Sequence, residues 1–142
     1  LEREREIEAA TGFTGKQIEE IAKKTLEESR DFFSRGNAAF ILKDYKETVL
    51  WYGMAANNGH VNAQLRLGWM YETGLGVDKQ DYNEAAKWYT KAAENGNPNA
   101  QFILGNYYKV GLGVKKDTSK AVFWYREAAK QGDPNAQKEL IN

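Results

Sequence analysis

The sequence predicts an all-α solenoid built from stacked helix pairs, because its conspicuous motifs recur at a nearly constant interval. Gly-Asn-Pro-Asn-Ala begins at Gly96, returns as Gly-Asp-Pro-Asn-Ala at Gly132, and has a weaker form, Gly-His-Val-Asn-Ala, at Gly59. These starts lie 37 and 36 residues apart, and the dipeptides Trp-Tyr and Ala-Ala recur at a similar interval. A period of this size indicates stacked units rather than one globular core.

Composition narrows the range of functions. The 142 residues include 20 basic and 20 acidic side chains, so the formal net charge is zero and we expect no broad surface for nucleic acid. Cysteine is absent, which removes disulfides and thiolate chemistry. No apolar stretch approaches the roughly 20 residues of a membrane helix, so we expect a soluble chain without membrane insertion. The charged opening at Leu1 is unlike a signal peptide, and the compartment stays open.

Residues 1–35 are expected to precede the repeats as a charged segment and an amphipathic helix. Thr14 and Gln17 have the spacing of a capping box. An apolar stripe at helical spacing then predicts a helix from residue 16 to about 35 that covers the first repeat. The stripe consists of Ile18, Ile21, Ala22 and Leu26 and leads toward Phe33. For residues 1–10 a short charged helix and disorder both fit the sequence.

The second helix of each unit carries the Trp-Tyr and Ala-Ala dipeptides. Ala85, Trp88, Ala92 and Ala93 fall at i, i+3, i+7 and i+8, which is one face of a helix. Small residues allow a neighbouring helix to approach closely, so the repeated tryptophans are expected to fill the inter-helix core beside them. The repeated tryptophans are Trp51, Trp88 and Trp124.

The ends of these helices are also predicted. Asp44 with Glu47 and Asp81 with Glu84 have the spacing of capping boxes, and Asp117 is the N-cap of the third helix. The helices are expected to end at Gly59, Gly96 and Gly132.

The first helix of each unit begins at an N-cap that is followed by proline in Asn97-Pro98 and Asp133-Pro134. His60, the only histidine, matches this N-cap position and is expected to be a weak cap at the surface. Gly68 and Gly105 lie in the middle of these helices, where glycine costs about 1 kcal/mol relative to alanine. That cost is tolerable if the partner helix crosses the backbone there.

The two helices of a pair are joined by a glycine-rich loop, Gly-Leu-Gly-Val, at 74–77 and 111–114. A phosphate-binding loop would need a preceding strand and a following Gly-Lys-Ser or Gly-Lys-Thr, and neither is present. We therefore interpret the glycines as turn residues. The sequence has no catalytic or metal-ligand motif, so no enzyme activity, cofactor or metal is predicted.

These residues resemble the Sel1-like repeat, a relative of the tetratricopeptide repeat with a longer loop between its helices. The matching pattern runs from Ala63 to Gly96 and again from Ala100 to Gly132. The resemblance implies an all-α, right-handed superhelical solenoid of antiparallel helix pairs. The expected parts are the N-terminal segment 1–35, a divergent tetratricopeptide-like first repeat at 36–59, Sel1-like repeats at 60–96 and 97–132, and a partial helix or C-terminal cap at 133–142.

One position breaks the repeat, because Trp69 has Asn106 as its counterpart and stacking therefore does not require an aromatic residue there. The resemblance to tetratricopeptide arrays places this helix face on the concave surface, where peptides or partner helices dock. Leu65, Phe102 and Ile103 fit packing between repeats equally well. The candidate partner-binding residues are Asn62, Leu65, Arg66, Trp69, Glu72, Asn99, Phe102, Asn106 and Lys109.

The sequence thus predicts a non-catalytic scaffold or adaptor that binds a protein or peptide partner. Two alternatives stay open. One is a targeting module of a larger enzyme or secreted effector, and the other is a glycan- or peptidoglycan-binding module that uses exposed aromatic residues. The sequence leaves the partner and any self-association undetermined.

Overall fold

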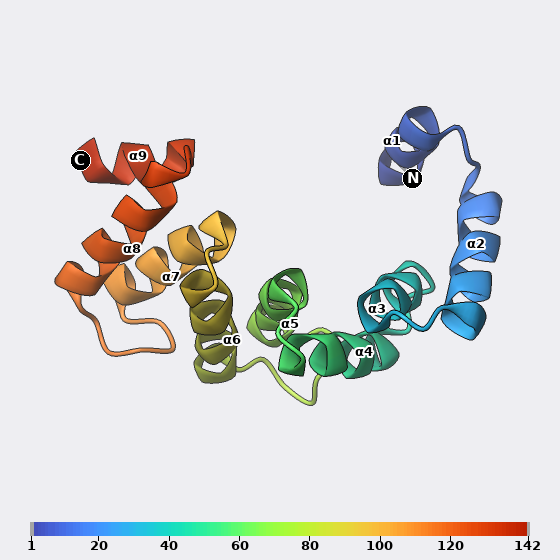
Figure 1. Cartoon of the computed structure of the whole chain (residues 1–142), viewed down its shortest axis with the longest axis horizontal. Coiled ribbons are helices and arrows are strands. Elements are labelled where there is room, and N and C mark those ends of the chain that lie inside the picture. The colour runs from blue at the N-terminus through green and yellow to red at the C-terminus, as the bar shows by residue number, and fades with distance from the viewer. Residues whose placement is uncertain (1, 142) are drawn as a thin grey trace.

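The computed structural model describes residues 2–141, which form an all-α, right-handed superhelical solenoid of antiparallel helix pairs without strands (Figure 1). The helices in this range are α1 (Glu2–Thr11), α2 (Gly15–Glu28), α3 (Phe32–Ile41), α4 (Tyr45–Asn57), α5 (Val61–Thr73), α6 (Tyr82–Glu94), α7 (Pro98–Val110), α8 (Thr118–Lys130) and α9 (Pro134–Ile141).

The helices stack in the order of the chain. α3 pairs with α4, α5 with α6, and α7 with α8, while α2 packs on α3 and α9 on α8. Figure 1 shows the resulting arc, with α3, α5 and α7 toward its open side and α4, α6 and α8 along its outer side. The first helices of the pairs therefore form the concave face.

Each helix pair is held together by a tyrosine ring packed on a glycine. Gly68 on α5 faces Tyr89 on α6, and a Cβ added to Gly68 would lie 2.8 Å from the Cδ1 and Cε1 atoms of that ring. Gly105 faces Tyr125 in the same way, and a Cβ there would lie 2.6 Å from Cε1. This confirms the expectation that the partner helix crosses the backbone at the mid-helix glycines, because only a residue without a side chain leaves room for the ring.

The tyrosines are the fully buried aromatic residues of the second helices. Trp88 and Trp124 pack against the core as predicted, but they are only partly buried. Tyr89 is completely buried, whereas its neighbour Trp88 is half-buried. Consecutive helical residues point about 100° apart. Tyr89 therefore faces Gly68 of its own pair, and Trp88 packs against the core that α4 and α5 form between consecutive units. Trp124 likewise packs against the core between α6 and α7.

At the predicted capping boxes of Asp44 and Asp81, the N-cap side chain accepts the expected bond, but the reciprocal bond of the box is absent. The Asp81 side chain accepts from the Glu84 backbone N–H at 3.0 Å, as a cap requires. The reciprocal bond of a capping box is replaced, because the Asp81 backbone N–H donates to the Tyr71 carbonyl at 2.9 Å. Both halves of the box are present only at Thr14 in the predicted set. The other predicted caps, Asp44, Asp117, His60 and Asn97, each accept from the expected backbone N–H, and Gly59, Gly96 and Gly132 have positive φ.

The N-terminal region differs from the prediction of one helix from residue 16 to about 35. α2 ends at Glu28, and a new helix, α3, begins at Phe32 behind the N-cap Asp31. The Asp31 carboxylate accepts from the Ser34 hydroxyl at 2.6 Å and from the Ser34 backbone N–H at 3.3 Å, which provides a start signal inside the predicted helix. Within residues 1–10, positions 2–10 lie in the helix α1, so the helical alternative holds for that described part.

The glycine-rich loops seat each pair on the preceding one. Gly76 has φ of 78°, and a Cβ on it would overlap the carbonyl group of Tyr45 at the start of α4. Gly113 has the same relation to Tyr82 at the start of α6. These loops therefore serve packing and turn geometry, as interpreted from the sequence.

Buried glutamines provide a polar link between consecutive units that the sequence reading missed. The Gln64 side chain on α5 donates to the Ala56 carbonyl on α4 at 3.2 Å, and Gln101 donates to the Ala93 carbonyl at 3.1 Å. Each of these carbonyls lies at the C-terminal end of the preceding helix and also accepts from a glycine N–H, that of Gly59 or Gly96, so the glutamine adds a second bond that joins two units.

We expect Gly68→Ala to lower the free energy of unfolding by about 1–3 kcal/mol, because the new methyl group would collide with the Tyr89 ring. Gly53→Ala is the matched control, since Gly53 also lies in a helix but has nothing within 4 Å of an added Cβ. There the change should stabilise by about 0.5–1 kcal/mol. Urea denaturation followed by circular dichroism measures both, and equal effects would contradict the proposed Gly–Tyr contact.

Candidate functional site

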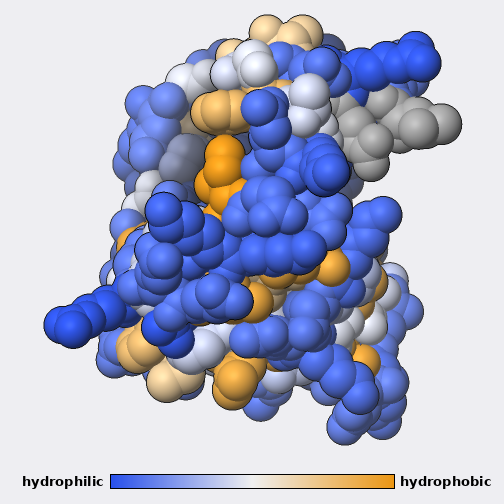
Figure 2. Space-filling view, turned by 90° about the vertical axis from the view of Figure 1, so that its right-hand side faces the viewer, coloured by the Kyte–Doolittle hydropathy of each residue, from blue (hydrophilic) through white to orange (hydrophobic). Residues whose placement is uncertain are grey.

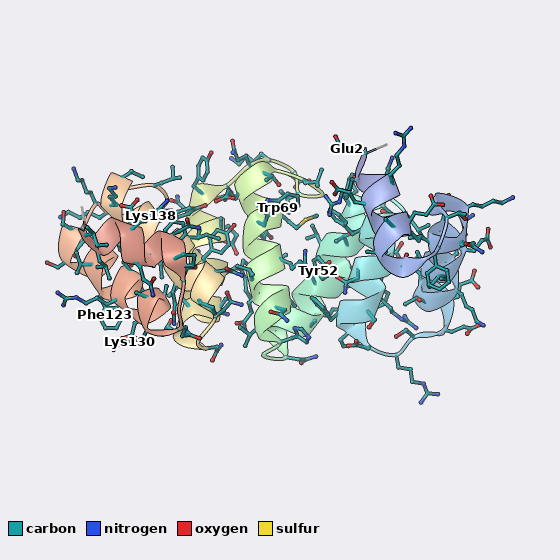
Figure 3. All side chains as sticks on the ribbon, turned by 90° about the horizontal axis from the view of Figure 1, so that it is seen from above. Glu2, Tyr52, Trp69, Phe123, Lys130 and Lys138 are labelled. Atoms are coloured by element: carbon teal, nitrogen blue, oxygen red, sulfur yellow. The ribbon has the colours of Figure 1, made fainter. Side chains whose placement is uncertain are left out.

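A cavity of about 360 Å³ lies on the concave face between α3, α5 and α7. Figure 3 views this face from above, with Trp69 on the central helix α5. The cavity is lined by Arg3, Phe40, Tyr52, Leu65, Arg66, Trp69, Met70, Tyr89, Asn99 and Ile103. Three successive units and the N-terminal helix α1 contribute to it, so the site exists only in the stacked array.

Trp69 is the aromatic residue of this cavity that solvent reaches most readily, with 40% of its surface exposed. Its ring meets Phe40 of the preceding unit edge to face, at a centroid distance of 6.1 Å and an interplanar angle of 64°. An exposed tryptophan supported from one side has a free face with which to contact a partner.

A hydrogen bond to the tyrosine hydroxyl is part of the first and third helix pairs. The Tyr52 hydroxyl donates to Asn37 Oδ1 at 2.5 Å, and the Tyr125 hydroxyl donates to Asn106 Oδ1 at 2.5 Å. Both asparagines directly follow the glycine on which the ring packs. The asparagine therefore completes the Gly–Tyr contact by accepting from the buried hydroxyl.

The middle pair lacks this bond, because Trp69 stands where the other units have asparagine. The Tyr89 hydroxyl is buried and, among the side chains that the structure describes, has no hydrogen-bond partner of normal geometry, a condition it shares there with Trp88 Nε1. Burial raises the pKa of Tyr89, and so do the charge of Glu72 and a contact between the Glu72 carboxylate and the Tyr89 hydroxyl. Glu72 therefore lies within reach of this hydroxyl, although the two groups form no hydrogen bond of normal geometry. Glu72 itself accepts from the Tyr107 hydroxyl at 2.6 Å. An unsatisfied buried hydroxyl costs about 1–3 kcal/mol.

The charged side chains described in the cavity lining are basic. Arg3 and Arg66 line the cavity, and none of the lining residues that the structure describes carries a carboxylate. Among the side chains that the structure describes, neither arginine forms an ion pair. Both guanidinium groups are therefore free to meet an anion at the mouth of the cavity.

The structure separates the candidate residues by whether they line the cavity. Four of them do: Leu65, Arg66, Trp69 and Asn99. The others lie outside the lining, where Asn62 is exposed and the remaining candidates contact other parts of the fold. Glu72 bonds to Tyr107, Asn106 to Tyr125 and Lys109 to Glu139 at 2.9 Å, while Phe102 packs against the core shared by α8 and α9.

Sequence reasoning missed Arg3, Phe40 and Tyr89 in the cavity. Phe40 could have been found from the repeat register, because it stands four residues after Gly36 as Glu72 stands four after Gly68. Tyr89 repeats in every unit, and the sequence analysis interpreted residues that repeat in every unit as structural, so it did not predict Tyr89 as a site residue. Arg3 had no such signal, since its position depends on how α1 folds back over the concave side.

The comparisons with known proteins identify the family. The Sel1 repeat model matches residues 31–60, 61–97 and 98–133, which together cover more than half of the chain. The chain belongs to the Sel1 repeat family. Sel1 repeats generally act as non-catalytic modules of protein–protein interaction. No helix within residues 2–141 has the length and apolar character needed to cross a membrane.

Solved structures of other Sel1 repeat proteins are similar to this chain. A Sel1 repeat protein from Oxalobacter formigenes is 34% identical, with a TM-score of 0.70, over 78% of this chain and 44% of its own. A protective antigen of uropathogenic Escherichia coli with the SLR fold is 29% identical, with a TM-score of 0.67, over 94% of this chain and 34% of its own. The chain thus spans less than half of either.

A third similar structure has nearly the same extent as this chain. Cysteine-rich protein B of Helicobacter pylori is 25% identical, with a TM-score of 0.70, over 89% of this chain and 97% of its own. This chain has no cysteine, so no disulfide links its repeats. A search of curated proteins found no match.

We expect Tyr125→Phe and Tyr89→Phe to have different effects on stability. Tyr125→Phe removes the hydrogen bond to Asn106 and should lower the free energy of unfolding by about 0.5–1.5 kcal/mol. Tyr89→Phe removes a buried hydroxyl without a partner and should be neutral or stabilising. Chemical denaturation of both variants beside the wild type provides the comparison; a loss at Tyr89 as large as that at Tyr125 would show that its hydroxyl is satisfied.

The buried tyrosines should make the fold sensitive to alkaline pH. Burial raises the pKa of Tyr125 to about 12 and also raises the pKa of Tyr52. The unfolded chain, with a tyrosine pKa of about 10, loses these protons first, so stability present below pH 10 is lost between about pH 10 and 12. Circular dichroism and tyrosinate absorbance should change together in this range. Ionisation of every tyrosine with full helicity retained would contradict the prediction.

Proposed function

We propose that this chain is a non-catalytic interaction module that binds a peptide or a partner helix on its concave face, with Trp69 as the anchor. The observation that carries the proposal is the position of Trp69. It replaces an asparagine that has a structural task in the other two units, and it lies 40% exposed at a cavity. The middle unit thus departs from the repeat at the point where a partner has access.

The properties of the cavity support this use. Its volume of about 360 Å³ lies within the ordinary range of binding pockets, and it accommodates one large side chain of a partner. Tryptophan and arginine are the residue types that most often dominate binding energy at interfaces, and Trp69 and Arg66 lie side by side in the lining. Asn99 adds an exposed amide that can bond to a peptide backbone.

The outer side of the arc offers a contrast. Leu50 on α4 is 58% exposed and does not line the cavity. A single exposed leucine is normal on a protein surface and does not indicate a site. It therefore provides a matched apolar position away from the concave face.

Affinity capture from lysate of the source cells tests the proposal. Trp69→Ala should lose at least about tenfold in the amount of captured partner, as expected for a hot-spot truncation of 1.4 kcal/mol or more. Leu50→Ala should capture as much as the wild type. If Trp69→Ala remains folded by circular dichroism and captures the same proteins in the same amounts, the concave face is not the binding surface.

A further inference from the structure

We propose that the occupant of the concave cavity is an acidic peptide segment that brings three groups: a large apolar side chain, a neutral carbonyl oxygen and a carboxylate. This inference rests on the proposed function and specifies the chemistry of the partner. Three separate features of the cavity carry it: the apolar walls, the Tyr89 hydroxyl and the two arginines. Among the described side chains, the hydroxyl has no hydrogen-bond partner of normal geometry and the arginines have no counter-ion.

The apolar walls select the first group. Phe40, Leu65, Trp69, Met70 and Ile103 come from three successive units and surround a space of about 360 Å³. Burying a leucine, phenylalanine or methionine side chain there gains about 1.5–3 kcal/mol of transfer free energy. A wholly polar segment would leave these walls in contact with water and gain nothing from them.

The Tyr89 hydroxyl selects the second group. In the other two helix pairs the equivalent hydroxyl donates to a neutral amide oxygen, at Asn37 and Asn106. A main-chain carbonyl of a peptide offers the same acceptor. The negative charge of Glu72, which lies near Tyr89, disfavours a carboxylate at this point. The hydroxyl is buried in the free protein, so the occupant reaches it by displacing a wall side chain.

The arginines select the third group. Arg66 is on α5 and Arg3 is on α1, and the described lining residues include no carboxylate to neutralise them. A charge-assisted hydrogen bond between a guanidinium group and a carboxylate is about twice as strong as a neutral one. An acidic residue next to the buried apolar side chain therefore complements the cavity, whereas a basic residue there is repelled.

Selection from a phage-displayed library of random peptides on the folded full chain tests the proposal. Enriched peptides should combine a large apolar residue with aspartate or glutamate close by. With the resynthesised peptides, Arg66→Gln and Arg3→Gln should each raise Kd by about 3- to 10-fold through loss of a charge-assisted bond. Arg5→Gln is the matched control, because Arg5 is exposed on the same helix but does not line the cavity.

The hydroxyl is tested separately with the same peptides. Tyr89→Phe should raise Kd by about 3- to 10-fold, although the free protein is at least as stable as the wild type. Tyr125→Phe should leave Kd unchanged. Trp69→Asn restores the arrangement of the other two units by offering an amide to Tyr89, and it should abolish enrichment while the fold is kept.

Three outcomes would each overturn the inference. In the first, the library selects basic peptides. In the second, the wild type enriches peptides no more than the Trp69→Asn variant does. The third outcome is a peptide Kd that neither Tyr89→Phe nor the arginine variants change. These failures can be distinguished from failure of the proposed function. If Trp69→Ala loses partners captured from lysate but the library selects no acidic peptides, the concave face binds a partner of other chemistry. If Trp69→Ala changes neither result, both proposals fall.

Discussion

The contact on which this structure depends is the packing of a tyrosine ring against a mid-helix glycine in every helix pair. Glycine is a poor helix former, and its cost is offset because the absent side chain lets the second helix approach until the ring of Tyr52, Tyr89 or Tyr125 lies on the backbone. The close approach then orients the other groups. It directs the neighbouring tryptophans toward the core between consecutive units, and it buries a hydroxyl that needs an acceptor. In two of the pairs an asparagine supplies that acceptor from the position next to the glycine.

The same contact explains how the middle unit departs from the repeat without losing its fold. Replacing the asparagine by Trp69 leaves the fold of the pair intact, because the ring still packs on Gly68. It leaves the Tyr89 hydroxyl without a partner and adds an exposed aromatic surface at the centre of the concave face. A stacked array provides a place for such an exception, since the units on both sides keep the complete contact and hold the geometry. The local loss of stability can therefore coexist with a binding surface.

Particular residues show why the structure differs from some predictions made from the sequence. The helix predicted from residue 16 to about 35 is interrupted because Asp31 caps a new helix by accepting from Ser34, although the apolar stripe continues past this point. The tryptophans were assigned to the core because they repeat in register with alanines. The tyrosines beside them repeat equally, and only the crossing of two helices decides which ring is enclosed. Asn106 and Lys109 had the spacing of concave-face residues, but each is engaged by a neighbour far away in the sequence.

The sequence by itself determined the period, the paired helices, most caps, the turns and the position at which the repeat is broken, because each of these follows from local patterns or from comparing one unit with the next. Only the tertiary structure decided which residues form the cavity. Arg3, Phe40 and Asn99 belong to different helices and come together through the curvature of the stack and the return of α1 over its open side. It also decided that the Tyr89 hydroxyl has no acceptor of normal geometry among the described side chains, since hydrogen bonding depends on distances between helices. Periodicity predicts that helices pack, whereas their mutual placement decides what the packed surface can bind.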